Sequence, residues 1–186
     1  MNASSLPASL KGLRTGQSLT IEQLSKRSGV SRAMISKIER GEAVPTTSTL
    51  GKLAEALDVS ISQMVGGPKE AGLHLTRHAE QPVFTEPGTG FSRRSLSPLY
   101  RGRGVDFVLN TLPPGKTTGP FPSHRPGVEE HLYVQSGNVA ITVGDERHEL
   151  NAGDFLFYPG DREHVFQNIG DEEAAFFIVI DNKTNR

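Results

Sequence analysis

Residues 19–60 read LTIEQLSKRSGVSRAMISKIERGEAVPTTSTLGKLAEALDVS, and the structure expected of the N-terminal third of the chain follows from this stretch. Thr20 precedes a helical pattern and Gln23 stands three residues later, which is the arrangement of a capping box. Gly29 interrupts the pattern with a residue that tolerates the left-handed backbone of a tight turn. Ser31 can then cap the next helix. The stretch therefore predicts two short helices joined by a tight turn.

The helix after this turn combines an apolar face with a polar one. Ile35 and Ile38 can pack inward, and the residues that share the opposite face at helical spacing are Arg32, Ala33, Ser36 and Lys37. Arg and Lys donate to guanine O6 and N7, and Ala contacts the thymine methyl group. Contacts to phosphates are expected from the helix N-termini with Thr20 and Ser31, and from the cation of Arg40. The pattern predicts a helix that reads base edges in the major groove of DNA.

The periodicity of the chain changes near residue 66. Helical spacing runs from about Ser4 to Val65, with a fourth helix expected around Thr49–Leu57 and a short fifth helix after Ser60. The composition of residues 66–72, GGPKEAG, is that of a linker. Short apolar or alternating runs follow at 105–112, 131–135, 139–143, 154–159 and 174–180. Many short strands between turn signals are typical of a β-sandwich or a closed barrel.

Composition and charge restrict the class of protein. The chain has no cysteine, which excludes disulfides, thiolate catalysis and Cys-ligated zinc. Residues 1–65 carry eight Lys and Arg against five Asp and Glu, and residues 66–186 carry twelve against sixteen. A basic front part fits a DNA-binding role. Because no run resembles a signal peptide or approaches the roughly 20 apolar residues of a membrane span, we expect a cytoplasmic protein without a membrane partner.

The N-terminal region resembles the helix-turn-helix domain of the Cro/C1-type family, also called the XRE family. The resemblance covers roughly residues 10–65 and includes Gly29, the run from Ser31 to Gly41, and the segment from Pro45 to Leu50. It implies that Arg32, Ala33 and Lys37 stand where family members read bases. It also implies a salt bridge between Arg14 and Glu39 that ties the first helix to the third.

The C-terminal region resembles the cupin superfamily, whose fold is a small jelly-roll β-barrel. Two motifs carry the resemblance: His124-x5-Glu130-x6-Gly137 and Gly153-x5-Pro159-x-Asp161-x2-His164-x3-Asn168. In that superfamily two His, a Glu and a further His usually bind a divalent metal. By position, the resemblance implies that His124, Glu130 and His164 are the first, third and fourth ligands. Pro126 replaces the second ligand, and Asp161 replaces the turn glycine.

Two interpretations of this C-terminal site remain open. Three ligands and a water could hold Zn, Ni, Fe or Mn. Alternatively, His124, Glu130 and His164 form a hydrogen-bonded polar cluster that, with Arg125 beside it, binds an organic ligand directly. The arginines at 93, 94, 101 and 103 could hold an anionic ligand, although a solvated sheet edge is the favoured interpretation. We expect most of the aromatic residues to be core: Tyr133, Phe155, Phe157, Phe166, Phe176 and Phe177.

These observations predict a two-domain protein. Residues 1–65 form an all-α, five-helix DNA-binding domain, residues 66–72 a linker, and residues 73–186 an all-β cupin-like domain for effector sensing and dimerisation. The predicted function is that of a homodimeric transcriptional regulator, with no catalytic residues, whose affinity for a double-stranded DNA operator depends on a small-molecule effector. The alternatives are a metal-dependent cupin enzyme fused to a DNA-binding head, which Pro126 argues against, and a DNA-binding antitoxin.

Overall fold

The computed structural model describes residues 6–66, 73–97 and 105–182, and the first of these ranges is helical. Its helices are α1 (Leu6–Gly16), α2 (Ile21–Ser28), α3 (Arg32–Glu39), α4 (Thr47–Ala56) and α5 (Ile61–Gly66). Their shared apolar core includes Leu10, Leu24, Ile35, Ile38, Leu50, Leu53 and Leu57, none of which is exposed. The helices are short, so burial of one apolar face of each, rather than intrinsic propensity, holds them together.

Local capping sets the helix boundaries. The Thr20 hydroxyl accepts from the Gln23 amide at 3.1 Å, and the Gln23 side chain accepts from the Thr20 amide at 2.8 Å, which confirms the capping box. Gly29 has φ of 69°, the left-handed conformation expected in the turn. The Ser31 hydroxyl accepts from the Met34 amide and so caps α3. α4 begins at Thr47, two residues earlier than expected, because the Thr46 hydroxyl caps it.

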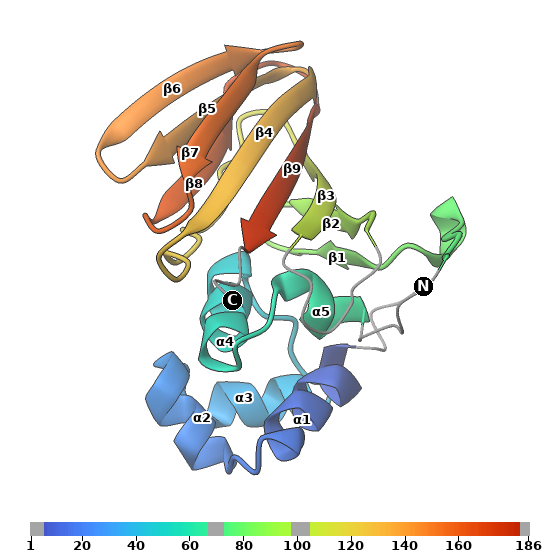
Figure 1. Ribbon diagram of the computed structural model, residues 1–186, viewed down its shortest axis with the longest axis vertical. Coiled ribbons are helices and arrows are strands. Elements are labelled where there is room, and N and C mark those ends of the chain that lie inside the picture. The colour runs from blue at the N-terminus through green and yellow to red at the C-terminus, as the bar shows by residue number, and fades with distance from the viewer. Residues whose placement is uncertain (1–5, 67–72, 98–104, 183–186) are drawn as a thin grey trace.

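The strand-rich region consists of two antiparallel sheets that face each other (Figure 1). The larger sheet has the strand order β1-β2-β3-β9-β4-β7, and the smaller has the order β6-β5-β8. A 3-10 helix, η1 (His78–Glu80), precedes the first strand. The strands are β1 (Val83–Thr85), β2 (Ser92–Ser95), β3 (Val105–Leu112), β4 (Val128–Ser136), β5 (Asn138–Val143), β6 (Glu146–Asn151), β7 (Phe155–Pro159), β8 (His164–Asn168) and β9 (Ala174–Asn182). The sequence pattern did not predict β1, β2, β6 or β8.

The two faces of the larger sheet differ from the sequence expectation. Phe166 and Phe176 are buried, as expected of core residues. Tyr133, Phe155 and Phe157 are instead 45%, 59% and 48% exposed, so their assignment to the core was wrong. Neighbouring residues of a strand point to opposite faces. The alternation places these three on the side of the larger sheet that faces away from the smaller sheet.

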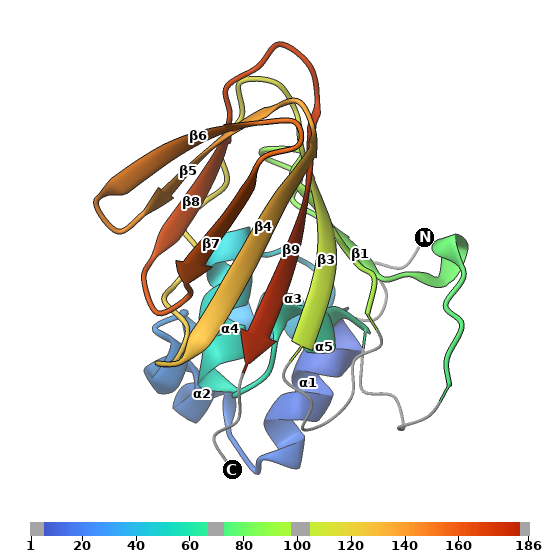
Figure 2. The same cartoon turned by 45° about the horizontal axis from the view of Figure 1, so that its top comes forward.

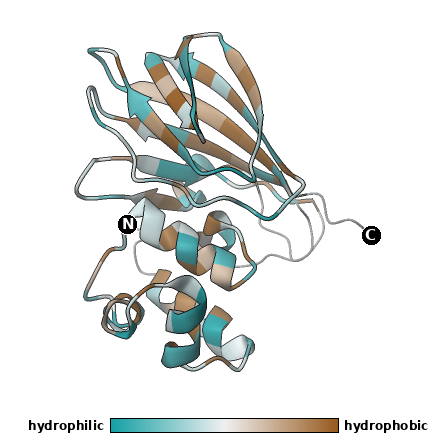
Figure 3. Cartoon of the chain, turned by 90° about the vertical axis from the view of Figure 1, so that its left-hand side faces the viewer, coloured by the Kyte–Doolittle hydropathy of each residue, from teal (hydrophilic) through white to brown (hydrophobic). Residues whose placement is uncertain are grey.

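The helices pack at one end of the strand-rich region (Figures 1 and 3). α4 and α5 lie next to the sheets, whereas α3 lies with α1 and α2 on the far side (Figures 1 and 2). Gly66, which was expected to open the linker, is the last residue of α5, and 67–72 lie outside the described residues. No helix in the described ranges has the length and apolar character needed to cross a membrane.

Candidate nucleic-acid interface and interior polar site

α3 presents the polar face that the sequence predicts. Ile35 and Ile38 are fully buried, whereas Arg32, Ala33 and Lys37 are exposed. Ser36 is partly exposed, and both N-cap residues, Thr20 and Ser31, are exposed. The helix therefore keeps its apolar side in the core and leaves its Arg, Ala and Lys side chains available on the opposite side. The side chains of this surface are of types that contact base edges, and a single helix is narrow enough to fit a major groove.

The orientation of α3 relative to α1 is fixed by an ion pair. Arg14 Nε lies 2.6 Å from Glu39 Oε1, and Arg14 Nη2 donates to Glu39 Oε2 at 2.9 Å. Arg14 Nη1 also donates to the Leu19 carbonyl at 2.7 Å. The hydrogen bond to Glu39 raises the pKa of Arg14, which therefore stays charged. The salt bridge implied by the family resemblance is confirmed, and its bidentate geometry holds the two helices in one register.

Arg40, at the end of α3, is exposed but already has partners. Its Nε and Nη2 donate to the two carboxylate oxygens of Glu42 at 2.6 and 2.7 Å, and its Nη1 donates to the Ser36 hydroxyl. A phosphate contact by Arg40 would therefore replace the contact with Glu42.

The residues of the cupin motifs meet inside the strand-rich region. His124 Nε2 lies 3.0 Å from Glu130 Oε1, and His164 Nε2 lies 3.7 Å from the same atom. Tyr158, which the sequence analysis did not single out, donates its hydroxyl to Glu130 Oε2 at 2.6 Å. The Arg162 carbonyl lies 3.1 Å from His164 Nδ1 and orients that ring. His124 is about one third exposed, whereas Glu130 and His164 are buried, so the cluster is open to solvent on the His124 side.

The electrostatics of the cluster keep Glu130 ionised. Burial raises the pKa of Glu130, but the charge of His164 and the contact with His124 more than offset this and lower it to about 2. Burial, followed by the negative charge of Glu130, raises the pKa of Tyr158 well above its usual value. Tyr158 is therefore a neutral hydrogen-bond donor, and Glu130 is an anion that two histidines and one phenol surround.

The donor set of this cluster does not fit a metal centre. Among residues 6–66, 73–97 and 105–182, no group of three His, Cys, Asp or Glu side chains is arranged to hold a metal ion. Pro126 is exposed at the position of the second cupin ligand and offers no donor atom. One oxygen of Glu130 is already engaged by Tyr158. The geometry favours the hydrogen-bonded polar cluster of the sequence analysis over the metal site.

Arg93 is part of the interior, which corrects its interpretation as a solvated edge residue. Its side chain is 6% exposed, and its Nη2 lies 3.4 Å from Asp106 Oδ2. The register of β3, β9, β4 and β7 places Asp106, Ile180, Glu130 and Tyr158 in one row across the sheet. Asp106, the acidic partner of this buried ion pair, thus lies in the same row as Glu130 and Tyr158. Arg94 is half-buried and donates to the His78 carbonyl, while 101 and 103 lie outside the described residues.

Arg125 does not join the cluster. Its side chain is about half exposed, and its Nη1 lies 3.7 Å from Asp58 Oδ1, in the turn after α4. Its position directly after His124 in the chain predicts a place beside the ligand. In the structure its contact is with the helical region instead. His131 packs against the rings of Phe155 and Phe157 on the outer face, so it points away from Glu130 as expected.

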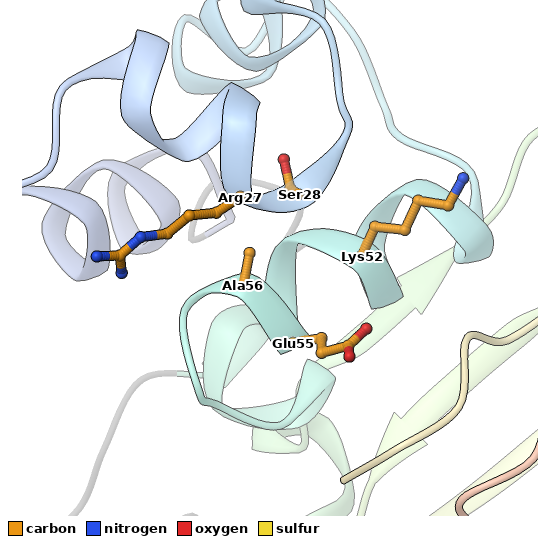
Figure 4. Close-up of a pocket in the computed structure, with 5 residues that line it drawn as sticks. All are labelled: Arg27, Ser28, Lys52, Glu55 and Ala56. Carbon is orange, nitrogen blue, oxygen red and sulfur yellow. The ribbon is translucent and has the colours of Figure 1, made fainter.

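An open hollow lies between α2 and α4 (Figure 4). It is lined by Arg27, Ser28, Lys52, Glu55 and Ala56. The cationic ends of Arg27 and Lys52 extend away from each other (Figure 4). Because its charged groups do not converge on one point, we assign no ligand to this hollow.

Comparisons with known proteins cover both regions. Residues 10–64 match the helix-turn-helix family HTH_3, and residues 108–180 match the cupin domain family Cupin_2. The chain is 29% identical over 175 residues to the HTH-type transcriptional regulator SutR of Escherichia coli (strain K12), covering 94% of this chain and 93% of SutR. It is 25% identical to the HTH-type transcriptional regulator PuuR of the same organism, covering 86% of this chain and 85% of PuuR.

A solved structure agrees with this chain over its whole length. The crystal structure of an HTH_3 family transcriptional regulator from Vibrio cholerae superposes with a TM-score of 0.78 at 26% identity. The superposition covers 99% of this chain and 98% of that protein. The similarity therefore extends to the combination of the two regions and not only to each region separately.

Proposed function

Because this chain joins a helix-turn-helix domain of the HTH_3 family to a cupin domain, we propose that it is a cytoplasmic, homodimeric transcriptional regulator. In this proposal α3 recognises an operator, and the interior polar site receives a small-molecule effector that alters operator affinity. Residues 1–65 and 73–186, with the linker 66–72 between them, are the two working units. The observation that carries the proposal is the exposed Arg32–Ala33–Lys37 face on a helix whose isoleucines are fully buried.

The assignment of roles on DNA follows from the position of each group. Arg32, Ala33, Ser36 and Lys37 lie on the free face of α3 and read base edges. Thr20 and Ser31 stand at helix N-termini, where backbone amides and hydroxyls bind phosphate. Arg40 supplies a further cation to the backbone. A regulatory rather than enzymatic role agrees with the full-length relatives, which are named as transcriptional regulators.

This assignment is tested with an operator selected from random duplex DNA. Lys37→Ala and Arg32→Ala should each weaken binding to the selected duplex by about 1–3 kcal/mol, with little effect on random duplex, because a base contact carries sequence information. Arg40→Ala should weaken both duplexes similarly. Arg147→Ala, an exposed cation on β6, is the matched control. Selection that yields no preferred duplex, or full operator affinity in both α3 variants, would contradict the base-reading assignment.

The outer face of the larger sheet supports the homodimer. Exposed apolar side chains on this face are Val105, Phe107, Tyr133, Phe155 and Phe157. The cross-strand register groups them into neighbouring rows, and rings already pair along the face, as in Phe107 with Phe177 at 5.5 Å. A two-fold interface uses the same patch on both copies, so a single apolar face is sufficient to build it. Two copies would then present two α3 helices to two operator half-sites.

The dimer is tested by measuring mass in solution. The wild type should have twice the chain mass of 20.1 kDa in sedimentation equilibrium. Phe157→Ser should weaken the dimer at least about tenfold, because a central aromatic side chain is lost from both copies. Leu75→Ser, which alters an apolar side chain that is 67% exposed outside the sheet, should change nothing. A monomeric wild type, or equal dissociation constants for all three proteins, would rule out this interface.

The effector site is assigned to the cluster of His124, Glu130 and His164. A ligand entering on the His124 side meets imidazole nitrogens, an ionised carboxylate and a neutral phenol within a largely apolar interior. A small number of polar groups that converge within apolar walls is typical of small-molecule sites. An effector changes operator affinity only if it binds two states of the protein unequally. An effector at this site can therefore act on operator binding only through contacts that link the site to α3.

A further inference from the structure

α4 is docked onto the strand-rich region through a buried hydrogen bond at its N-terminus. The Thr47 amide donates to Glu86 Oε1 at 3.1 Å, and both residues are buried. The hydroxyl of Thr89 donates to the other oxygen of Glu86 at 2.7 Å and fixes the carboxylate. A carboxylate at a helix N-terminus is favourable because it meets unpaired amides and the positive end of the helix dipole. α4 is thus held by a residue 39 positions away in the chain.

The second contact between the two regions is the close approach of the α4 backbone at Gly51 to the ring of Pro122. A Cβ atom built at Gly51, in the middle of α4, would lie only 2.6 Å from Pro122 Cδ. On the other side, a Cβ atom at Gly119 would lie 3.5 Å from both Ser48 Cβ and Thr47 Oγ1. The segment 119–124, called the coupling segment below, therefore fits directly against the first two turns of α4. Surfaces in such close contact transmit a displacement rather than absorb it.

The coupling segment also forms one wall of the effector site. The Phe121 amide donates to the His164 carbonyl at 2.9 Å, and the His164 amide donates to the Phe121 carbonyl at 3.2 Å. The two rings stack with centroids 5.4 Å apart and an interplanar angle of 8°. Two residues after Pro122, His124 contacts Glu130. The same short segment therefore touches the site on one side and α4 on the other.

We propose that the coupling segment carries the regulatory signal: occupancy at His124 and His164 shifts this segment, and Pro122 passes the shift to α4. From α4 the shift reaches α3 through α2, which packs against both helices. This inference rests on the proposed function, because it assumes an effector at the polar cluster and an operator at α3. The route is non-covalent and runs through described contacts, so it does not depend on a change of spacing through the covalent linker 66–72.

The first experiment measures hydrogen exchange of the α4 amides in the full chain without DNA. Gly51→Ala forces the coupling segment away, so exchange in residues 47–52 should accelerate at least about fivefold, the lower end of typical coupling. Gly12→Ala is the matched control, since both changes improve helix propensity and a Cβ at Gly12 meets nothing within 4 Å. His124→Ala, which removes the imidazole from the site and leaves both Pro122 and Gly51 in place, should also change α4 exchange. Pro122→Ala removes the contacting Cγ and Cδ and serves if Gly51→Ala does not fold.

The second experiment is a double-mutant cycle on operator affinity. His124→Ala and Gly51→Ala should be non-additive by at least about fivefold, whereas His124→Ala and Gly12→Ala should be additive. The proposed role of the coupling segment would be overturned by additive effects in both cycles together with an unchanged α4 exchange rate in His124→Ala. Operator binding by the wild type would still support the proposed function in that case. If no duplex is preferred, the proposed function fails, and the exchange experiment on the protein alone still decides whether site and α4 are coupled.

Discussion

The helical and strand-rich regions place their polar functional groups in opposite ways. On α3, Arg32 and Lys37 are exposed, and the proposed function has them contact DNA outside the protein. In the strand-rich region, Glu130 and His164 are buried and contact each other, and the buried Arg93 contacts Asp106. An exposed charged group contributes little to the free energy of unfolding, so its removal changes stability little. A buried charge is stable only if its neighbours offer it partners, so losing one partner is costly. We therefore expect mutations of these groups to differ in what they damage: DNA recognition on α3, and folding in the strand-rich region.

The largest effect is expected where a buried pair is broken. Asp106→Ala leaves the guanidinium of Arg93 buried without its partner, and unfolding should become easier by about 3–5 kcal/mol. Urea unfolding followed by circular dichroism measures the loss. The double variant Arg93→Met with Asp106→Leu removes both charges and should recover most of the stability. A loss below about 1 kcal/mol in Asp106→Ala would show that the interior of this region is as tolerant as the surface of α3.

A somewhat smaller effect is expected from pH, and it is specific to Glu130. Its pKa is about 2 in the folded protein against an ordinary value of 4.5, so the ionised form favours folding. The stabilisation is complete above about pH 4.5 and is lost as pH falls toward about 2, which amounts to about 3 kcal/mol. The free energy of unfolding of wild type minus that of Glu130→Gln should therefore shrink over this interval. A difference that stays constant with pH would mean that the carboxylate is not held by its neighbours.

The smallest effect is expected at the surface of the helical region. Thr20→Ala removes the hydroxyl that accepts from the Gln23 amide, and it should cost about 1 kcal/mol in thermal unfolding. Thr15→Ala is the control, because within the described part of the chain the Thr15 hydroxyl bonds to carbonyls of its own helix and caps no helix end. If Thr20→Ala costs as much as Asp106→Ala, exposure is not what separates the two regions.

The helical region could be predicted closely because its decisive contacts are local. The capping box spans four residues, the turn depends on Gly29 alone, and the two faces of α3 follow from a spacing of three to four. The start of α4 was placed two residues late because Thr46 is one of several neighbouring Thr and Ser residues that can cap. The salt bridge of Arg14 with Glu39 joins residues 25 positions apart, and it came from the family resemblance rather than from the pattern.

The strand-rich region could be predicted only in part because some of its strands lack a pattern of apolar residues. In β2 the inward residues are Arg93 and Ser95, and in β6 only Leu150 is buried, so neither strand shows hydrophobic alternation. The motif residues His124, Glu130 and His164 do meet, as the resemblance implied. Tyr158 and Glu86 were missed because their partners are 28 and 39 residues away, and only the strand register and the docking of α4 bring them together.

The contact of Arg40 with Glu42 has a consequence for how DNA binding responds to salt. A cation that meets a phosphate normally weakens binding in salt, because ions condensed on the DNA are released and their concentration opposes association. Glu42 already serves Arg40 as a counterion that is covalently part of the protein. When a phosphate takes its place, a repelled carboxylate is left near the duplex, which cancels part of the electrostatic gain. At the operator, Arg40 would then exchange the Glu42 carboxylate for a DNA phosphate. The carboxylate of the protein itself would in this way limit nonspecific binding to DNA.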